Sequence, residues 1–454
     1  MHDEDTTEDS EESLASIRIS RKRLLYHDKN QRELRRIRKS FSFRLGNHLV
    51  LAVQRPWRLI FLPVSIPMLL WKSLREKAEK SRFLDEESLD DIEEQADCIV
   101  FFPSNGVGFG HFTRLFAIAK KIRDIRPEIE LIFFTTMPTL HLLENEGFPA
   151  YHLPGRYRFE DMDAKVWNLM TEEMMSAVMH VHRPKMFVFD GSYPYRGMLN
   201  GIKGRDNLQK IWVRRGNFKK RAKPIPTDSI RHFDLTISPK DSVPLVVDSN
   251  AEDVSNVNCS PILLLDRKEL LPRETLRRRV GIPLDAIVVY VQLGAGRINE
   301  IGSDLQLTID ILSNYEEIYV VLGESMLGEK IQIIGERIRK IREYPNSRYF
   351  NSFDFAIMAG GYNSYHEAVN YSLPTICYPN LDTGKDDQLA RVKVAEEAGC
   401  MTVITDVNAE TVTHAIENML IPENRKQMSE AAEKLFSANG ASEVSQMLID
   451  RFDN

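Results

Sequence analysis

The sequence predicts an α/β protein in which two doubly wound, Rossmann-like parallel sheets face a cleft, preceded by a basic helical extension. Short apolar runs such as "CIVFFP" at 98–103 alternate with amphipathic stretches, which is typical of parallel strands covered by helices on both faces. The alternation comes in two successive series, from about residue 97 to 239 and again from about 286. A chain of 454 residues also exceeds the size at which a single core stops growing, so two packed domains are expected.

The composition is that of a soluble globular protein with reduced thiols. Hydrophobic residues make up 43% of the chain and charged residues 28%, so the chain can bury a sizeable core. The cysteines are far apart, without CxxC or Cys/His spacing, at Cys98, Cys259, Cys377 and Cys400. This pattern favours the cytosol and argues against a structural metal, so we expect no metal site.

Charge is distributed unevenly over the first 95 residues. Residues 1–13 contain seven acids and no Lys or Arg, whereas residues 14–82 contain about eighteen Lys or Arg against about four acids. A secretory signal needs a positive segment followed at once by an apolar core, and the acidic start lacks both. We therefore interpret residues 1–13 as a disordered acidic tail.

A membrane-associating extension is predicted over residues 14–95. Its apolar run from Trp57 to Trp71 is about 15 residues long and is interrupted by Pro63 and Pro67, which is too short for a spanning helix of roughly 20 residues. Tryptophan at each end and basic flanks suit a segment lying in the interface of an anionic membrane. We expect a cytoplasmic protein, peripheral on the cytoplasmic face. The alternative is a helical pair packed on the catalytic body, with its basic face merely solvated.

The first α/β series is expected to form an N-terminal domain over residues 96–260. A glycine-rich loop and a helix follow its first strand, a second helix closes at Gly147, and a long helix lies near 160–182. Its strands are read from "DCIVFFP", "IELIFFTT", "YHLP", "MFVFDG", "KIWVRRG" and "DLTISP".

The second series is expected to form a C-terminal domain over residues 284–454, joined to the first by a connecting region at 261–283. Its strands are read from "AIVVYVQLGAG", "EIYVVLG", "FAIMAGG" and "PTICYP". Helices are predicted near 302–313, near 326–341, from Ser364 and from Asp386.

Candidate ligand-binding residues follow the strands, because doubly wound sheets bind ligands beyond the carboxyl ends of their strands. The first series places there Asn105, Gly106, Gly108, Gly110, His111, Arg114, Asp190, Arg214 and Arg215. The second places there Gly294, Ala295, Gly296, Gly360, Gly361, Asn363, Ser364, Glu367, Asp387, Gln388 and Arg391. Glycines let the backbone approach a phosphate, and helix N-termini favour negative charge. Such a cleft suits a nucleotide diphosphate.

The loop "SNGVGFGHFTR" at 104–114 does not fit a dinucleotide site, because the GxGxxG pattern needs glycine at 111 and this chain has His111. It resembles instead the first loop of GT-B glycosyltransferases, in which His follows the glycines. "DFAIMAGGYNSYHEAVNYSLPTICYPNLDTGKDDQLARV" resembles the donor-binding signature of the same fold. The likeness is to the branch that contains the peptidoglycan-pathway N-acetylglucosaminyltransferase and the UDP-glycosyltransferases, and it covers roughly residues 97–405.

The resemblance implies roles for these residues. Glu367 binds the ribose hydroxyls, and Asp387 and Gln388 contact the donor sugar. From its place after the first strand, across the cleft from Glu367, and from an imidazole pKa of about 6.5, His111 is expected to be the catalytic base, with Asp190 to orient it. The residues implied to hold the diphosphate or face the nucleotide are Gly294, Gly296, Gly360, Gly361, Asn363 and Ser364. The residues implied to contact acceptor or phosphate are Gly108, Gly110, Arg114, Arg214 and Arg215.

Each of these residues also has a plainer explanation. Glu367 can be a first-turn acid favoured by the helix dipole, and His111 can satisfy a backbone group at a helix start. Asp190 can form a turn before Gly191. Arg214 and Arg215 can be one packed and one solvated cation, and the loop glycines can serve the turn alone.

The resemblance implies a glycosyltransferase that moves a hexose or N-acetylhexosamine from a UDP-sugar to a lipid-linked or polysaccharide acceptor, as in cell-envelope polysaccharide biosynthesis. The reaction is expected to invert the anomeric centre and to need neither metal nor cofactor. We expect no nucleic-acid partner. Two alternatives stay open, a UDP-N-acetylglucosamine 2-epimerase and a non-catalytic membrane adaptor that binds a nucleotide sugar. The segment "YPNSRYFNSFD" is the candidate for reading the base.

Overall fold

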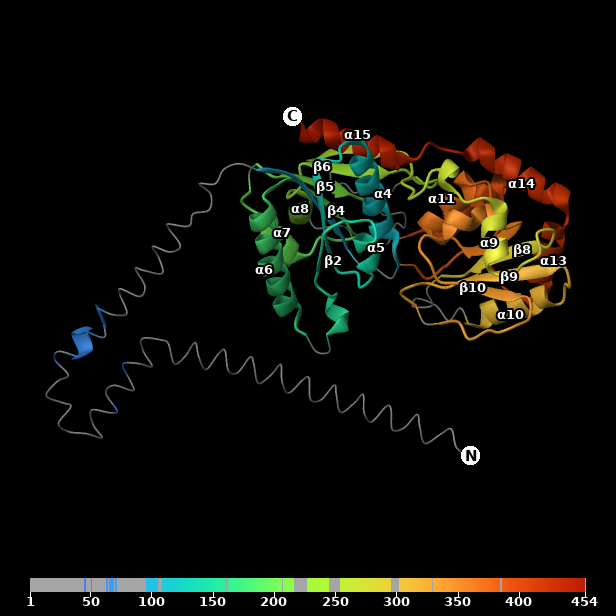
Figure 1. The fold of residues 1–454 in the computed structure, drawn as a ribbon, viewed down its shortest axis with the longest axis horizontal. Helices are drawn as coiled ribbons and strands as arrows, with labels where there is room; N and C mark the ends of the chain where they lie inside the picture. Colours follow the sequence, from blue (N-terminus) through green and yellow to red (C-terminus); the bar gives the residue numbers. More distant parts are fainter. Residues whose placement is uncertain are drawn as a thin grey trace. The chain divides into compact units, whose positions relative to one another are not determined.

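The structure is a computed structural model in which Gln95–Asn454 form one compact unit (Figure 1). It describes residues 95–453 except 105–107, 160–161, 206, 216–226, 245–253, 295–301, 329 and 384–385, and it also describes residues 45, 50, 63, 65–68, 70 and 71. The predicted acidic tail at 1–13 and most of the predicted extension at 14–95 therefore lie outside the described residues, as do Asn105, Gly106, Ala295 and Gly296. Within the described part of the chain, no helix is both long and apolar enough to cross a membrane.

The first half of the compact unit is built on a seven-stranded, all-parallel sheet in the order β3-β2-β1-β4-β5-β6-β7. The order reverses between β1 and β4. The strands are β1 Ala96–Pro103, β2 Glu130–Thr135, β3 Ala150–His152, β4 Pro184–Asp190, β5 Gln209–Val213, β6 Leu235–Pro239 and β7 Ser255–Cys259.

Helices cover both faces of this sheet because its central strands, β1 and β4, have apolar side chains on both faces. On β1, Ile99 packs with α4 on one face, whereas Val100 packs with α6 on the other. Figure 1 shows α6 and α7 side by side along one flank. The helices are α4 Gly110–Ile125, α5 His141–Glu144, α6 Ala164–His182, α7 Arg196–Ile202 and α8 Thr227–Ile230, with a 3-10 turn η3 at Arg156–Arg158.

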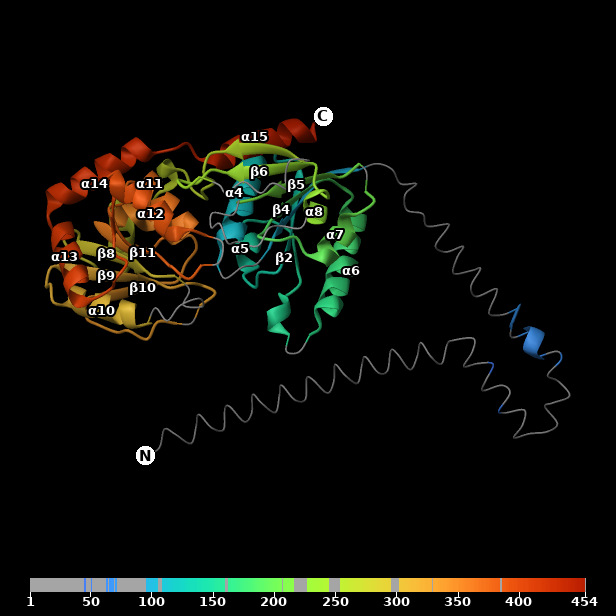
Figure 2. The same cartoon turned by 180° about the vertical axis from the view of Figure 1, so that it is seen from behind.

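The second half is built on a six-stranded, all-parallel sheet in the order β10-β9-β8-β11-β12-β13, which reverses between β8 and β11. Figure 2, the view from behind, shows α11 and α12 next to one another on this half. The strands are β8 Ile287–Gln292, β9 Ile318–Gly323, β10 Ile338–Ile341, β11 Phe355–Ala359, β12 Thr375–Tyr378 and β13 Met401–Val403. The helices are α9 Arg273–Arg279, α10 Gly302–Ser313, α11 Tyr362–Asn370, α12 Gln388–Glu397, α13 Ala409–Leu420, α14 Pro422–Leu435 and α15 Gly440–Phe452, with 3-10 turns η5 Arg267–Glu269 and η6 Asn346–Ser352.

The helix predicted near 326–341 is wrong. The described residues of 326–337 contain no helix, and Ile338–Ile341 form the edge strand β10, which pairs with β9 from Ile338↔Val320 to Ile341↔Gly323. Apolar residues at helical spacing in "IQIIGERIRKI" suggested the helix. Pairing along the open edge of β9 outweighs that local preference.

The last helix, α15, packs on the first half of the unit although it follows the second half in sequence. Figure 1 shows it running alongside α4, and the Ser445 hydroxyl donates to the carbonyl of Ile118 at 3.0 Å. The Arg126 guanidinium bonds the Asp453 carboxylate just beyond the helix. The domain bounds 96–260 and 284–454 stay predictions, and α15 is the element that crosses between them.

Candidate active site

The candidate residues lie where each sheet reverses its strand order. In the first sheet, the end of β1 leads to α4, and its neighbour β4 ends at Asp190, paired with Pro103. In the second sheet, Gly294 follows β8, and the segment from Gly360 follows β11, its neighbour. These positions are where doubly wound sheets bind their ligands.

His111 and Asp190 are in contact, as the sequence suggested. The His111 Nδ1 atom lies 2.7 Å from Asp190 Oδ1. The Asp190 side chain is 1% exposed and that of His111 is 22% exposed. With Asp190 ionised, the tautomer that carries the proton on Nδ1 satisfies this contact and leaves Nε2 as an acceptor.

Arg114, predicted to contact acceptor or phosphate, is instead engaged with Asp190. Its Nε and NH2 donate to the two carboxylate oxygens at 2.8 Å each, and its NH2 also lies 2.9 Å from His111 Nδ1. Such a bidentate pair fixes the plane of the carboxylate. Sequence reasoning missed this role, although the spacing of three residues on one helix placed Arg114 beside His111.

The charges around this pair keep Asp190 ionised and His111 neutral. Burial alone would raise the pKa of Asp190, but Arg114 and His111 outweigh it and lower that pKa. Burial lowers the pKa of His111 below its ordinary 6.5, and Arg114 and Arg215 lower it further against the opposing effect of Asp190. A neutral imidazole beside an ionised carboxylate is the arrangement expected of a general base.

Glu367, the predicted ribose ligand, lies on α11 and faces Ser347 of η6. The Ser347 hydroxyl donates to Glu367 Oε1 at 2.9 Å. Burial raises the pKa of Glu367 to about 7, against the opposing effect of Ser347. No cation bonds this carboxylate among the described residues, so it can accept hydrogen bonds from a ligand.

A cavity of about 540 Å³ lies between the glycine loop at Gly108–Gly110 of the first half and the residues around Glu367 of the second. It has the size of a small-molecule site. Two amide oxygens in its wall, Asn346 Oδ1 and Asn363 Oδ1, are buried without a hydrogen-bond partner among the described residues. The predicted residues in its wall are Gly108, Gly110, Arg215, Gly294, Gly361, Asn363, Ser364, Glu367 and Gln388. His111 is not part of this wall but follows Gly110, which is.

The glycines of the second half serve different purposes. Gly294 has a φ of +105°, a backbone conformation that residues other than glycine rarely adopt. A Cβ on Gly360 would lie 2.9 Å from Val392 Cγ1, so Gly360 allows α12 to pack close to β11. Gly361 begins α11 and borders the cavity, with no atom of the described residues within 4 Å of an added Cβ. Gly296 lies outside the described residues.

Three further predicted site residues, Asp387, Gln388 and Arg214, make contacts within the protein. The Asp387 carboxylate caps α12 by accepting from the Ala390 amide at 3.1 Å, and it is not part of the cavity wall. Gln388 borders the cavity while its Oε1 accepts from the Asn380 amide at 2.9 Å. Arg214 is buried, and its guanidinium lies 5.4 Å from the centre of the Trp212 ring.

Sequence reasoning missed a buried ion cluster that joins the two halves. Arg391 of α12 donates to Asp241, just after β6, from Nε and NH2 at 2.7–3.1 Å, and it also bonds Asp386. Arg215 donates to Asp386 at 2.6 Å. The guanidinium of Arg215 lies 4.2 Å from the centre of the Tyr362 ring, which borders the cavity. Ordinary charged residues 150 positions apart gave no signal in the sequence.

The segment after β10 also bridges the halves. The Tyr344 hydroxyl donates to Thr113 Oγ1 at 2.8 Å, and the Tyr344 ring stacks on Phe109 with centres 4.8 Å apart. Tyr344, Asn346 and Ser347 border the cavity. They belong to the stretch that the sequence suggested for reading the base, a role that stays a prediction.

No protein-family model matches this chain. A protein of Methanosarcina acetivorans named an uncharacterized glycosyltransferase is 23% identical to it over 325 residues, which cover 65% of this chain and 82% of that protein.

Solved structures share the fold. MurG of Acinetobacter baumannii aligns with a TM-score of 0.51 at 12% identity, over 78% of this chain and 99% of that one. A Listeria monocytogenes protein assigned as a UDP-N-acetylglucosamine 2-epimerase aligns with a TM-score of 0.53 at 12% identity, over 77% of this chain and 94% of that one. At these identities the likeness shows the fold alone, and the two-sheet fold predicted from the sequence is confirmed.

Proposed function

We propose that this chain, a GT-B glycosyltransferase by fold and by resemblance, transfers a hexose or N-acetylhexosamine from a UDP-sugar to a hydroxyl of a lipid-linked or polysaccharide acceptor. The observation that carries the proposal is the cavity of about 540 Å³, which reaches from the glycine loop of the first sheet to Glu367 and Ser364 of the second. The donor-binding residues that the resemblance implied and the loop before His111 thus meet in one site.

The donor nucleotide is held by the second half in this proposal. The Glu367 carboxylate accepts hydrogen bonds from the ribose hydroxyls, and the first amides of α11, after Gly361, face the diphosphate, where the helix dipole favours negative charge. Arg215 is the one cation in the described part of the cavity wall, which also contains the carboxylates of Asp304, Glu324, Glu343, Glu367 and Asp382. In this proposal the α11 N-terminus and Arg215 stabilise the departing UDP, and independence of a metal ion rests on the resemblance alone.

The acceptor is activated by the first half. His111 Nε2 takes the proton of the attacking hydroxyl, while Asp190 holds Nδ1–H and stabilises the imidazolium that forms. Attack from the face opposite the departing UDP in a single displacement inverts the anomeric centre. Arg114 holds Asp190 in the orientation that this role requires.

A screen of the full-length protein with several UDP-sugars tests the proposal. UDP release should depend on added acceptor, supplied as a membrane lipid extract or as glycans. An epimerase, which the Listeria monocytogenes structure keeps as the second candidate, would convert UDP-N-acetylglucosamine without acceptor. A non-catalytic adaptor would bind UDP and release nothing.

We expect Glu367→Ala to weaken UDP-glucose binding by about 1–3 kcal/mol, because ribose hydroxyls would then be buried without a partner. Calorimetry measures the loss, and an unchanged circular dichroism spectrum shows that the variant is folded. Wild-type affinity in a folded Glu367→Ala variant would reject the ribose role.

The same carboxylate should make donor binding depend on pH. Its pKa is about 7, and the ionised form accepts the hydroxyl bonds. UDP-glucose affinity should therefore be full above pH 7 and fall, by at most about tenfold per pH unit, as the pH drops below it. Glu367→Gln removes the titrating group and should flatten this dependence. A wild-type affinity that is constant from pH 8 to pH 6 would contradict the assignment.

The extension supplies the route to a lipid-linked acceptor. We propose that residues 14–82 bind anionic membrane, since each basic residue near such a surface contributes about 1 kcal/mol. The few described residues of this run are helical, namely Pro63, Ser65–Met68, Leu70 and Trp71. The side chains of Met68 and Trp71 are 68% and 62% exposed. The Trp57–Trp71 run would then add apolar burial in the membrane interface.

We expect the full chain to sediment with anionic liposomes but not with neutral ones, and less so at high salt because exposed charges are screened. Deleting residues 1–82 should abolish this sedimentation and leave UDP binding intact. Undiminished sedimentation of the shortened protein would favour the packing alternative.

A further inference from the structure

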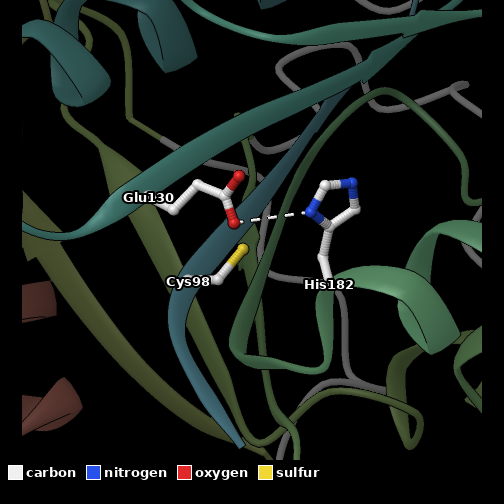
Figure 3. A group of neighbouring side chains, drawn as sticks. All are labelled: Cys98, Glu130 and His182. Atoms are coloured by element: carbon white, nitrogen blue, oxygen red, sulfur yellow. Dashed lines mark hydrogen bonds and ion pairs between the residues drawn. The ribbon is translucent and has the colours of Figure 1, made fainter.

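Three side chains of types that can bind a metal ion meet at the amino-terminal edge of the first sheet, opposite the candidate active site. They are Cys98 of β1, Glu130 of β2 and His182 of α6, and one ligand atom of each lies within 4.8 Å of the others. Figure 3 shows the Cys98 sulfur beside the Glu130 carboxylate, with the His182 ring pointing toward the same oxygen. Because strand ends that face the cleft lie at the other edge, the proposed transferase chemistry makes no use of this group.

The fold itself brings these residues together. Cys98 and Glu130 are register partners on neighbouring parallel strands, so their side chains share one face of the sheet. That face is covered by α6, which ends at His182. The left-handed residue Arg183 (φ 44°) then turns the chain into β4, and His182 is left above the first residues of β1 and β2.

We propose that Cys98, Glu130 and His182 bind one Zn²⁺ ion or a similar borderline-soft divalent cation. Thiolate, imidazole and carboxylate are the protein ligands of Zn²⁺, and in a tetrahedral site with bonds of about 2.0–2.3 Å they lie roughly 3.3–3.8 Å apart. The His182 Nδ1 atom lies 3.4 Å from Glu130 Oε2, within that range. A thiolate and an imidazole in one set disfavour Mg²⁺ and Ca²⁺, which prefer oxygen.

Tyr151 of β3 orients the imidazole for this role. Its hydroxyl lies 2.7 Å from His182 Nε2, and its ring meets the imidazole edge to face. A metal-ligating histidine usually bonds its other ring nitrogen to a neighbouring polar group, which fixes the tautomer and the ring plane. With Nε2–H donated to Tyr151, the Nδ1 lone pair faces Cys98 and Glu130.

Charge and access also fit a bound ion. A thiolate and a carboxylate together carry two negative charges, which a divalent cation neutralises. The side chains of Glu130 and His182 are 46% and 16% exposed, which leaves a path for the ion and a place for water as the fourth ligand.

No sequence motif points to such a site. Metal motifs are recognised from ligands a few positions apart, whereas these three ligands are separated by 32 and 52 residues. We expected no metal site because the cysteines lack the short ligand spacing of metal motifs. Parallel pairing of β1 with β2 places Cys98 beside Glu130 without any such spacing.

Metal titration of the full-length protein tests the proposal. After treatment with a chelator, the protein is titrated with Co²⁺, followed by absorption, and with Zn²⁺, followed by elemental analysis and thermal unfolding. We expect one ion per chain, a thiolate-to-cobalt absorption band, and a rise in Tm with Zn²⁺ because the ion binds only the folded state. Cys98→Ser should abolish the band. Cys259→Ser, which removes another buried cysteine, should retain it.

Tyr151→Phe is a second variant that keeps all three ligands and the aromatic packing. It should weaken Zn²⁺ binding by about 10–100-fold, as expected for loss of the group that orients a ligand. The proposal is overturned if the full-length protein gives no thiolate-to-cobalt band and retains no Zn²⁺, or if Cys98→Ser binds both metals as the wild type does. Either result would leave the three residues as a hydrogen-bonded group that stabilises this edge of the sheet.

Discussion

Replacing His111 by alanine should lower turnover by about 10²–10⁴-fold, the usual effect of losing a general base. UDP affinity should stay within a few-fold of the wild type, because the donor is held by α11 and its neighbours in the second half. Steady-state kinetics with a responsive acceptor measures the first effect, and calorimetry with UDP the second. His141→Ala, at an exposed position of α5 in the same half, serves as the matched control and should leave both unchanged.

The pH dependence of kcat should separate a base from a structural histidine. The pKa of His111 lies below its ordinary 6.5, mainly because of burial, and only the neutral imidazole can take the proton. Activity should therefore persist down to that lowered pKa and fall as the pH drops through it.

Asp190→Asn should give a smaller loss than His111→Ala, since it removes orientation and not the base. A His111→Ala enzyme with near wild-type kcat would show that His111 is not the general base.

Replacing Arg391 by methionine should destabilise the protein by about 3–5 kcal/mol. The Arg391 side chain is fully buried and bonds Asp241, which is 1% exposed. Removing Arg391 leaves this buried charge with only the more distant Arg215, at 3.7 Å, to compensate it. Its NH1 also donates to the carbonyl of Gly360 at 2.9 Å. Urea unfolding followed by circular dichroism measures the change in the free energy of unfolding.

The matched control for this experiment is Arg267→Met. Arg267 pairs with Glu433 at 3.2 Å, but the two side chains are 50% and 56% exposed, and such surface pairs contribute about 0–1 kcal/mol. Adding Asp241→Asn to Arg391→Met should recover part of the loss, because the double variant no longer buries a carboxylate that has lost its main partner. Equal effects of Arg391→Met and Arg267→Met would show that the ion cluster contributes little to stability.

The sequence was a good guide to the sheets and a poor guide to their edges. Strands such as β1 and β4 are buried on both faces, so their continuous apolar runs predict them directly. The edge strand β10 has the sequence "IRKI", whose charged residues suit an exposed edge as well as a helix. Local pattern alone could not separate the two, and pairing with β9 decides the outcome.

The candidate site was predictable where chain order fixes position. Asp190 is the last residue of β4, and His111 lies in the first turn of the helix after β1; the reversal of strand order between those strands brings them together. The bidentate hydrogen bonding of Arg114 to Asp190 could not be predicted, because it depends on side-chain geometry that sequence spacing does not specify. The pairing of Arg391 with Asp241 could not be predicted either, because it depends on how the second half packs against the first.

The path of α15 has a consequence for how the chain matures. Its residues from Gly440 to Phe452 complete the surface of the first sheet by packing on α4, the helix that bears His111. No contiguous amino-terminal fragment therefore contains a finished first half. During synthesis, α4 emerges from the ribosome more than 300 residues ahead of α15, so the apolar side chains of α4 that face α15 stay uncovered until α15 itself has been made.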